Sequence, residues 1–194
     1  MKQIALPLDE LRPGAQSSLI ISDSNAAVAA ALSQSANWPG RCAILVGPPR
    51  SGKNLMARYF TSLADGNIVD NADAVGEEAL FNAWNRAQEN SQGLLLVSRF
   101  LPADWHIALA DLRSRLGSAL LLQIPPPDDE MINQLIQKHL ADRGTAISHD
   151  ALSYLSKRIE RSYAAMEKFA KEANEIALAE NCAVNLILVK RLIG

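Results

Sequence analysis

The chain has 194 residues and a formal net charge of −2, and 48% of its residues are hydrophobic and 21% charged. This length suits one mid-sized core with a small appended domain, and the composition is typical of ordinary globular proteins. A pI near 5.9 lacks the basic character of nucleic-acid-binding proteins, so we expect no direct sequence-specific DNA binding. No apolar run reaches the ~20 residues that span a bilayer. We therefore expect a cytoplasmic protein with no membrane partner.

The first two thirds of the chain alternate apolar runs with helical patterns. Residues 1–18 lack regular periodicity and contain two prolines and a glycine, which predicts an extended N-terminal arm. Strands are expected at 41–46, 67–70, 94–98 and 119–124, and helices at 25–35, 55–63, 77–90 and 107–116. Continuous apolar strands suit a parallel sheet that is covered on both faces. The sequence thus predicts a three-layer α/β domain over residues 19–126.

Three consecutive prolines, Pro125-Pro126-Pro127, end this pattern. Proline cannot donate to a strand ladder and disfavours helix at the preceding residue, so we expect a domain boundary here. Beyond it, helices are expected at 128–142, 149–158 and 162–180, with a last one ending near residue 193. The sequence predicts a small all-helical domain over residues 127–194.

A glycine-rich segment follows the first expected strand and opens the next helix. Its residues are Gly47, Pro48, Pro49, Arg50, Ser51, Gly52, Lys53 and Asn54. The spacing matches G-x-x-x-x-G-K, in which backbone N–H groups wrap phosphate oxygens and the lysine adds a positive charge. The helix N-terminus adds a partial positive charge. We expect a phosphate loop that binds ADP or ATP, and the alternative is a plain turn.

The residues that would hold magnesium depart from the usual pattern. Asn54 stands where a Ser or Thr hydroxyl normally binds the metal, and its amide oxygen is a weaker ligand. Asp70 ends the second strand and is the candidate for the other metal-linked acid, or else a helix cap, but Asn71 follows it instead of a second carboxylate. We expect nucleotide binding with slow or absent hydrolysis. Ser98 is either a polar sensor of the γ-phosphate or a plain strand-end serine.

A segment before the last strand, Leu112-Arg113-Ser114-Arg115-Leu116, adds a further motif. With the phosphate loop and the helical domain behind it, the chain resembles the AAA+ ATPases and, more narrowly, the DnaA initiator family. In that family the arginine of a Ser-Arg-Phe or Ser-Arg-Leu segment is an arginine finger for a neighbouring subunit's nucleotide, and Arg115 falls on it. Such an arginine stabilises charge on the transferring phosphoryl group. The alternative is a surface helix with two solvated arginines.

The arm carries Gln3-Ile4-Ala5-Leu6-Pro7-Leu8, which resembles the peptides that bind the bacterial DNA sliding clamp, the beta subunit of DNA polymerase III. Gln3 offers an amide, Leu6 and Leu8 offer apolar plugs, and Pro7 stiffens the strand. The alternative is a strand that packs on its own domain. The combination resembles the DnaA-related regulators of the Hda type. That resemblance implies docking on the DNA-loaded clamp and presentation of Arg115 to ATP-bound DnaA, and leaves open whether a homodimer forms.

Two departures from this family pattern favour a smaller sheet and a weaker nucleotide sensor. The stretch between Lys53 and Asp70 is too short for an extra strand and helix, so a smaller sheet is expected. Ala164 falls where the helical domain usually carries a nucleotide-sensing arginine. Arg161, a turn away, is either its replacement or a solvated arginine at a helix start. Together with Asn54 and Asn71, this keeps open a second function, a nucleotide-insensitive clamp-binding adaptor.

Overall fold

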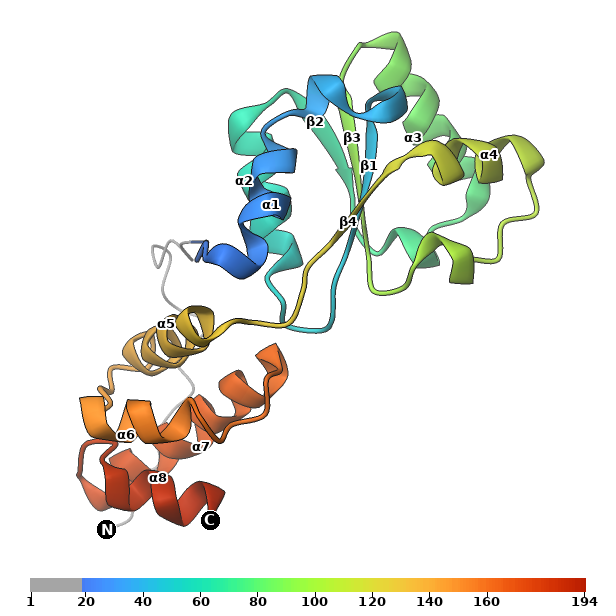
Figure 1. The fold of residues 1–194 in the computed structure, drawn as a ribbon. Helices are drawn as coiled ribbons and strands as arrows, with labels where there is room; N and C mark the ends of the chain where they lie inside the picture. The colour runs from blue at the N-terminus through green and yellow to red at the C-terminus, as the bar shows by residue number, and fades with distance from the viewer. Residues whose placement is uncertain (1–18) are drawn as a thin grey trace. The chain divides into compact units, whose positions relative to one another are not determined.

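The computed structural model describes residues 19–194. These residues form two compact units, Ile21–Pro126 and Pro127–Gly194. The first unit contains the sheet and the second contains helices (Figure 1). No helix among the described residues is long and apolar enough to cross a membrane.

The first unit is a parallel sheet between two layers of helices. Its four strands lie in the order β2-β3-β1-β4, and its helices α1 and α2 cover one face while α3 and α4 cover the other (Figure 1). The strands are β1 (Cys42–Val46), β2 (Gly66–Val69), β3 (Gly93–Ser98) and β4 (Leu120–Gln123). The helices are α1 (Asp23–Leu32), α2 (Lys53–Leu63), α3 (Glu77–Glu89) and α4 (Ala110–Ser118). The expected three-layer parallel α/β fold is therefore confirmed.

Alternating side chains of the two central strands supply the core on both faces, since successive residues of a strand point to opposite sides. Every residue of β1 and β3 is buried, as their apolar runs predict. Cys42, Ile44 and Val46 pack with Leu112 on the α3–α4 side. Phe60 is fully buried and stacks on Trp38 with ring centroids 5.2 Å apart.

The strand register brings three loops to one edge of the sheet. In β1, Val46 pairs with Ser98 of β3 and with Gln123 of β4. Ligands of open parallel sheets bind at the carboxyl ends of the strands, where such loops gather. This edge is therefore the place for the glycine-rich loop, which leaves β1.

The helix expected at 107–116 begins three residues later than predicted. Ala108 and Leu109 instead donate their N–H groups to the carboxylate of Glu77, at 2.7 and 2.8 Å. These bonds hold the segment extended, and they lower the pKa of Glu77 because they favour its charged form. The side chain of Glu77, at the start of α3, thus fixes where α4 begins.

The second unit consists of α5 (Asp129–Ala141), α6 (His149–Leu155), α7 (Tyr163–Glu180) and α8 (Leu186–Ile193). Within it, α5 packs on α7 and α6 packs on α8. Side-chain caps start three of the helices: Asp128 accepts from Met131 N at 2.7 Å, and Ser162 and Asn185 make the equivalent bonds. The expected helices are present, but the helix expected at 149–158 ends at Leu155.

Candidate nucleotide site and candidate arginine finger

The loop from Gly47 to Asn54 connects β1 to α2, as predicted, and needs its two glycines. A Cβ on Gly47 would lie 2.7 Å from Ser51 Oγ and 3.1 Å from Ile124 Cβ. Gly52 has a φ of 81°, a left-handed conformation that glycine adopts without strain. The spacing that defines the motif is thus a steric requirement of this turn.

Lys53 is the first residue of α2, and its side chain folds back over the loop. Its Nζ donates to the carbonyl oxygens of Gly47 at 2.6 Å and of Pro48 at 3.0 Å. Burial lowers the pKa of Lys53, the charge of Arg99 lowers it further, and the carboxylates of Asp70 and Asp73 act in the opposite direction. These groups therefore share one electrostatic environment.

The loop has donors suited to phosphate oxygens. Pro48 and Pro49 have no N–H group, so the amides that remain belong to Gly47 and to residues 50–54. Ser51 is 7% exposed, and its hydroxyl has no hydrogen-bond partner among residues 19–194. An unpartnered buried hydroxyl costs about 1–3 kcal/mol. A phosphate group would satisfy it, so the loop fits a nucleotide.

The acidic side chains of this edge include one that sequence reasoning missed. Asp70 follows β2, and its Oδ1 accepts from the backbone N–H of Asn71 at 2.9 Å. Asp73, three residues further on, accepts from Ser98 Oγ at 2.8 Å. No local pattern in the sequence marks Asp73, because its partner Ser98 lies twenty-five residues further along the chain.

Ser98 is 1% exposed, and its hydroxyl contacts Asp73 Oδ1 and the carbonyl oxygen of Phe100, each at 2.8 Å. Asn54 is exposed on the first turn of α2. No cluster of three or more His, Cys, Asp or Glu side chains capable of holding a metal occurs among the described residues. Asn54 and Asp70 would hold magnesium only together with phosphate oxygens and water, which is the usual way this ion binds.

Arg115 lies on α4 in a cage made by its own chain. Its guanidinium pairs with Asp111 at 2.6 and 3.0 Å and donates to Asn85 Oδ1 at 2.8 Å. It also lies 3.9 Å from the ring centroid of Trp84 and 4.6 Å from that of Phe81. The side chain is 23% exposed. Arg115 is therefore not a solvated surface arginine.

The cage explains the role of Trp84, which is a platform for the arginine and not only a packing anchor. None of the contacts made by the Arg115 side chain among the described residues involves the loop 47–54. The candidate nucleotide loop and the candidate arginine finger thus lie at separate places within the Ile21–Pro126 unit.

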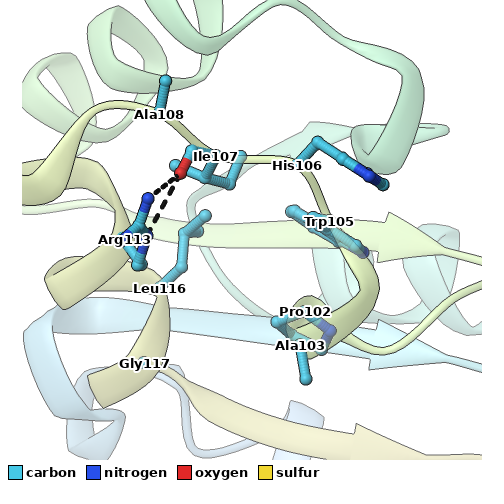
Figure 2. Close-up of a pocket in the computed structure, with 9 residues that line it drawn as sticks. All are labelled: Pro102, Ala103, Trp105, His106, Ile107, Ala108, Arg113, Leu116 and Gly117. Atoms are coloured by element: carbon cyan, nitrogen blue, oxygen red, sulfur yellow. Dashed lines mark hydrogen bonds between the residues drawn. The ribbon is translucent and has the colours of Figure 1, made fainter.

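A recess of about 650 Å³ lies between η5 (Pro102–Asp104) and α4 (Figure 2), and none of its lining residues belongs to the phosphate loop. Trp105, Ile107 and Leu116 give it largely apolar walls, and its arginine, Arg113, donates to the carbonyl oxygen of Ile107. The recess lacks the converging charged groups that a nucleotide phosphate needs.

Two further predictions concern the nucleotide-sensing position of the helical unit and the clamp-binding hexapeptide. Ala164 is exposed on α7, and Arg161 pairs with Asp129 of the same unit at 2.6 Å. Arg161 is thus already engaged by an acid. The predicted clamp-binding residues, Gln3 to Leu8, lie outside the described residues.

These features define a class of protein: a parallel sheet with a G-x-x-x-x-G-K loop between β1 and α2, followed in the chain by a helical unit, is a P-loop fold. No protein-family model matches the chain. The chain is 30% identical over 91 residues to the chromosomal replication initiator protein DnaA of Thermus thermophilus, in two strains. The match covers 47% of this chain and 21% of the relative. The chain thus spans about a fifth of the length of these relatives.

Solved structures give the particular form of the fold. The crystal structure of domain III of Thermotoga maritima DnaA superposes with a TM-score of 0.71 at 14% identity, over 90% of this chain and 95% of that domain. A DnaA bound to AMPPCP and single-stranded DNA gives 0.59 at 13% identity, over 84% of this chain and 66% of the other. Thermotoga maritima RuvB gives 0.56 at 18% identity, over 77% and 59%. The fold is therefore that of domain III of DnaA.

Proposed function

We propose that this protein regulates replication initiation by binding the DNA sliding clamp and stimulating ATP hydrolysis by DnaA, with Arg115 as an arginine finger in trans. The observation that carries the proposal is the placement of Arg115. It stands in a Ser-Arg-Leu segment on a helix of a DnaA-like fold and contacts α3 and α4 without touching its own phosphate loop. An arginine placed in this way does not serve its own nucleotide, and it would reach a nucleotide on another molecule after leaving its contacts with Asp111 and Asn85.

The partner is inferred from the similarity to DnaA. AAA+ domains act on one another across subunit interfaces, and the fold that this chain shares with domain III of DnaA supports the same arrangement here. An arginine finger supplied in trans raises hydrolysis by roughly 10³ to 10⁵-fold. The hydrolysed ATP in this proposal belongs to DnaA, and the loop Gly47–Asn54 holds a nucleotide of its own.

The clamp is inferred from the hexapeptide Gln3 to Leu8. Two leucines around a proline give apolar anchors on a stiffened strand, and the glutamine amide supplies hydrogen bonds. Docking on DNA-loaded clamp would confine the activity to DNA that carries a clamp. The hexapeptide therefore decides where the arginine acts.

The test is a reconstituted reaction that contains DnaA with bound ATP, clamp loaded on DNA, and this protein. Hydrolysis should accelerate with the wild type and stay at the basal rate with a Leu6→Ala plus Leu8→Ala variant. That variant should bind the clamp at least about 100-fold more weakly, since each buried leucine is worth about 1.5–3 kcal/mol and two are lost. A Leu11→Ala variant, changed downstream of the hexapeptide, is the control and should behave as wild type. Equal stimulation by the double variant would remove the clamp from the mechanism.

A nucleotide-insensitive clamp-binding adaptor is the second candidate function. The observation that favours it is the cage around Arg115, which holds the side chain within its own chain. Asn54, Asn71 and Ala164 also weaken the chemistry of a working ATPase. Calorimetric titration with ADP and ATP separates the two functions, because an adaptor with a degenerate loop binds neither at millimolar concentration.

A further inference from the structure

We propose that the helical unit contacts the phosphate backbone of double-stranded DNA through Arg158 and Lys190, two cations that share the ring of Tyr154. The contact is independent of base sequence, because phosphates carry no sequence information. It goes beyond the proposed function, since it needs neither Arg115 nor the clamp-binding hexapeptide.

The two helices that carry these residues start side by side. Ile147 forms a parallel bridge with Val184, and Ser148 donates its N–H to the Val184 carbonyl oxygen at 3.0 Å. From this bridge α6 and α8 begin, and they pack on each other. Tyr154 lies six residues after Ser148, and Lys190 lies six residues after Val184. Because helical residues rise by equal steps, Tyr154 and Lys190 reach the same level.

One aromatic ring holds both cations. Arg158 Cζ lies 3.9 Å from the centroid of the Tyr154 ring, and Lys190 Nζ lies 5.4 Å from it. Arg158 also donates to the carbonyl oxygen of Tyr154 at 3.2 Å. Lys190 is in the last turn of α8, and Arg158 follows the end of α6, where the partial negative charge of a helix favours cations. The ring and the helix ends therefore keep two positive charges together.

No acid neutralises these cations within residues 19–194. Arg158 and Lys190 make no ion pair there, and neither does Lys157, the exposed residue before Arg158. Glu160, the acid closest to Arg158 in the sequence, is exposed and pairs with none of them. Other cations of the helical unit do have acidic partners, in the pairs Lys138–Asp142, Arg161–Asp129, Lys168–Glu172 and Arg191–Glu180. The surface around Tyr154 is therefore positive on a chain whose net charge is −2.

The phosphate backbone of a DNA duplex matches this surface. A duplex carries one negative charge per about 1.7 Å of helix axis, so neighbouring phosphates can meet two cations held at one ring. Arginine binds a phosphate with two parallel hydrogen bonds, and lysine binds it as a point charge. An acidic protein would need two carboxylates at this one spacing, whereas a duplex offers phosphates along its whole length.

The contact has a use under the proposed function. A protein docked on DNA-loaded clamp meets the duplex at a high effective concentration, so even a weak phosphate contact prolongs docking. Arg158 and Lys190 would then favour clamp that carries DNA over free clamp.

The test is the fluorescence anisotropy of a labelled duplex of arbitrary sequence, titrated with the whole chain at several salt concentrations. Arg158→Gln plus Lys190→Gln replaces both charges with neutral amides and should weaken binding. The slope of log K against log salt should become shallower by about 1.8, because each phosphate contact contributes about −0.9. Arg158→Lys plus Lys190→Arg keeps both charges and should bind as wild type does.

The matched control is Lys168→Gln plus Arg191→Gln, which removes the same charge from two cations that already have acidic partners. It should keep the wild-type slope. An unchanged slope in the Arg158→Gln plus Lys190→Gln variant, or an equal change in the control, would overturn the DNA contact.

Two further measurements separate this contact from other roles. If the Arg158→Gln plus Lys190→Gln variant binds the duplex normally but loses affinity for DNA-free clamp or for DnaA, the surface binds protein and the DNA contact is wrong. The Leu6→Ala plus Leu8→Ala variant should bind free duplex as wild type does. A failure of clamp docking and a failure of the DNA contact are thereby told apart.

Discussion

Two regions of the Ile21–Pro126 unit hold positive charge in different ways. At the carboxyl edge of the sheet, Lys53 and the residues around it are placed by strand ends, glycines and backbone hydrogen bonds. On the α3–α4 face, Arg115 is held by side chains alone, and its acid partner Asp111 is 59% exposed. An ion pair with one largely exposed partner contributes little to stability, so losing the Asp111 contact costs little, and the contacts with Trp84 and Asn85 account for the rest of what holds the arginine. The candidate nucleotide loop is therefore fixed by the backbone, whereas the candidate finger is held by side chains that can move apart.

The largest expected difference between the two regions is in their effect on the affinity of the protein for its own nucleotide. Lys53→Ala should weaken ADP and ATP binding on the order of 100-fold, because a charge-assisted contact to phosphate is lost and the loop carbonyls lose their donor. Arg115→Ala should leave this affinity unchanged. Fluorescence titration with a labelled nucleotide measures both. The separation of the two regions fails if Arg115→Ala weakens nucleotide binding as much as Lys53→Ala does.

Alanine substitutions at two glycines, one in the loop and one on α4, should change the free energy of unfolding in opposite directions. Gly47→Ala should lower the free energy of unfolding by about 1–3 kcal/mol, because the new Cβ overpacks a tight turn. The clash is with Ser51 Oγ, 2.7 Å away. Gly117→Ala on α4 meets nothing within 4 Å and is the matched control. It should raise stability by about 0.5–1 kcal/mol, since alanine favours helix. Denaturant unfolding gives both values, and equal effects would show that the loop is not sterically constrained.

Loosening the cage should have a smaller effect on stability. Asp111→Asn removes an i, i+4 ion pair and should change the free energy of unfolding by less than about 0.5 kcal/mol. Stimulation of DnaA should stay equal or increase, since Arg115 leaves the cage more easily. A marked loss of stimulation would mean that the ion pair holds Arg115 in its working orientation.

The smallest expected effect is a pH dependence at Glu77, which fixes the start of α4. Its pKa is lowered in the folded protein by hydrogen bonds from Ala108 and Leu109. The stabilisation is therefore complete above the unfolded value of about 4.3 and is lost as pH falls through the lower folded value. Glu77→Gln should have a lower Tm than wild type between pH 6 and 8, and the difference should shrink below pH 4. A constant difference across this range would exclude the carboxylate as its cause.

The sequence predicts the sheet and the loop better than it predicts the surroundings of the site. The apolar runs of β1 and β3 and the spacing of Gly47, Gly52 and Lys53 are local patterns, and each forms the expected structure. The cage of Arg115 depends on Trp84 and Asn85, some thirty residues earlier in the chain, and no local pattern joins them. Asp73 was missed for the same reason, because its partner Ser98 is twenty-five residues away.

The start of α4 shows a related limit. Periodicity from Ile107 onward predicts helix, but the carboxylate of Glu77 captures two N–H groups that helix formation would otherwise leave unpaired. Tertiary contacts of this kind override local propensity.

The most direct test of Arg115 as an arginine finger is the single-turnover rate at which DnaA hydrolyses preloaded, labelled ATP in the presence of loaded clamp and this protein. Arg115→Ala should lose stimulation on the order of 10³-fold, while its clamp binding and its own nucleotide affinity match wild type. Arg113→Ala, two residues away on the same helix, should retain stimulation. An Arg115→Ala variant that accelerates hydrolysis as fast as wild type would contradict the assignment of Arg115 as the arginine finger.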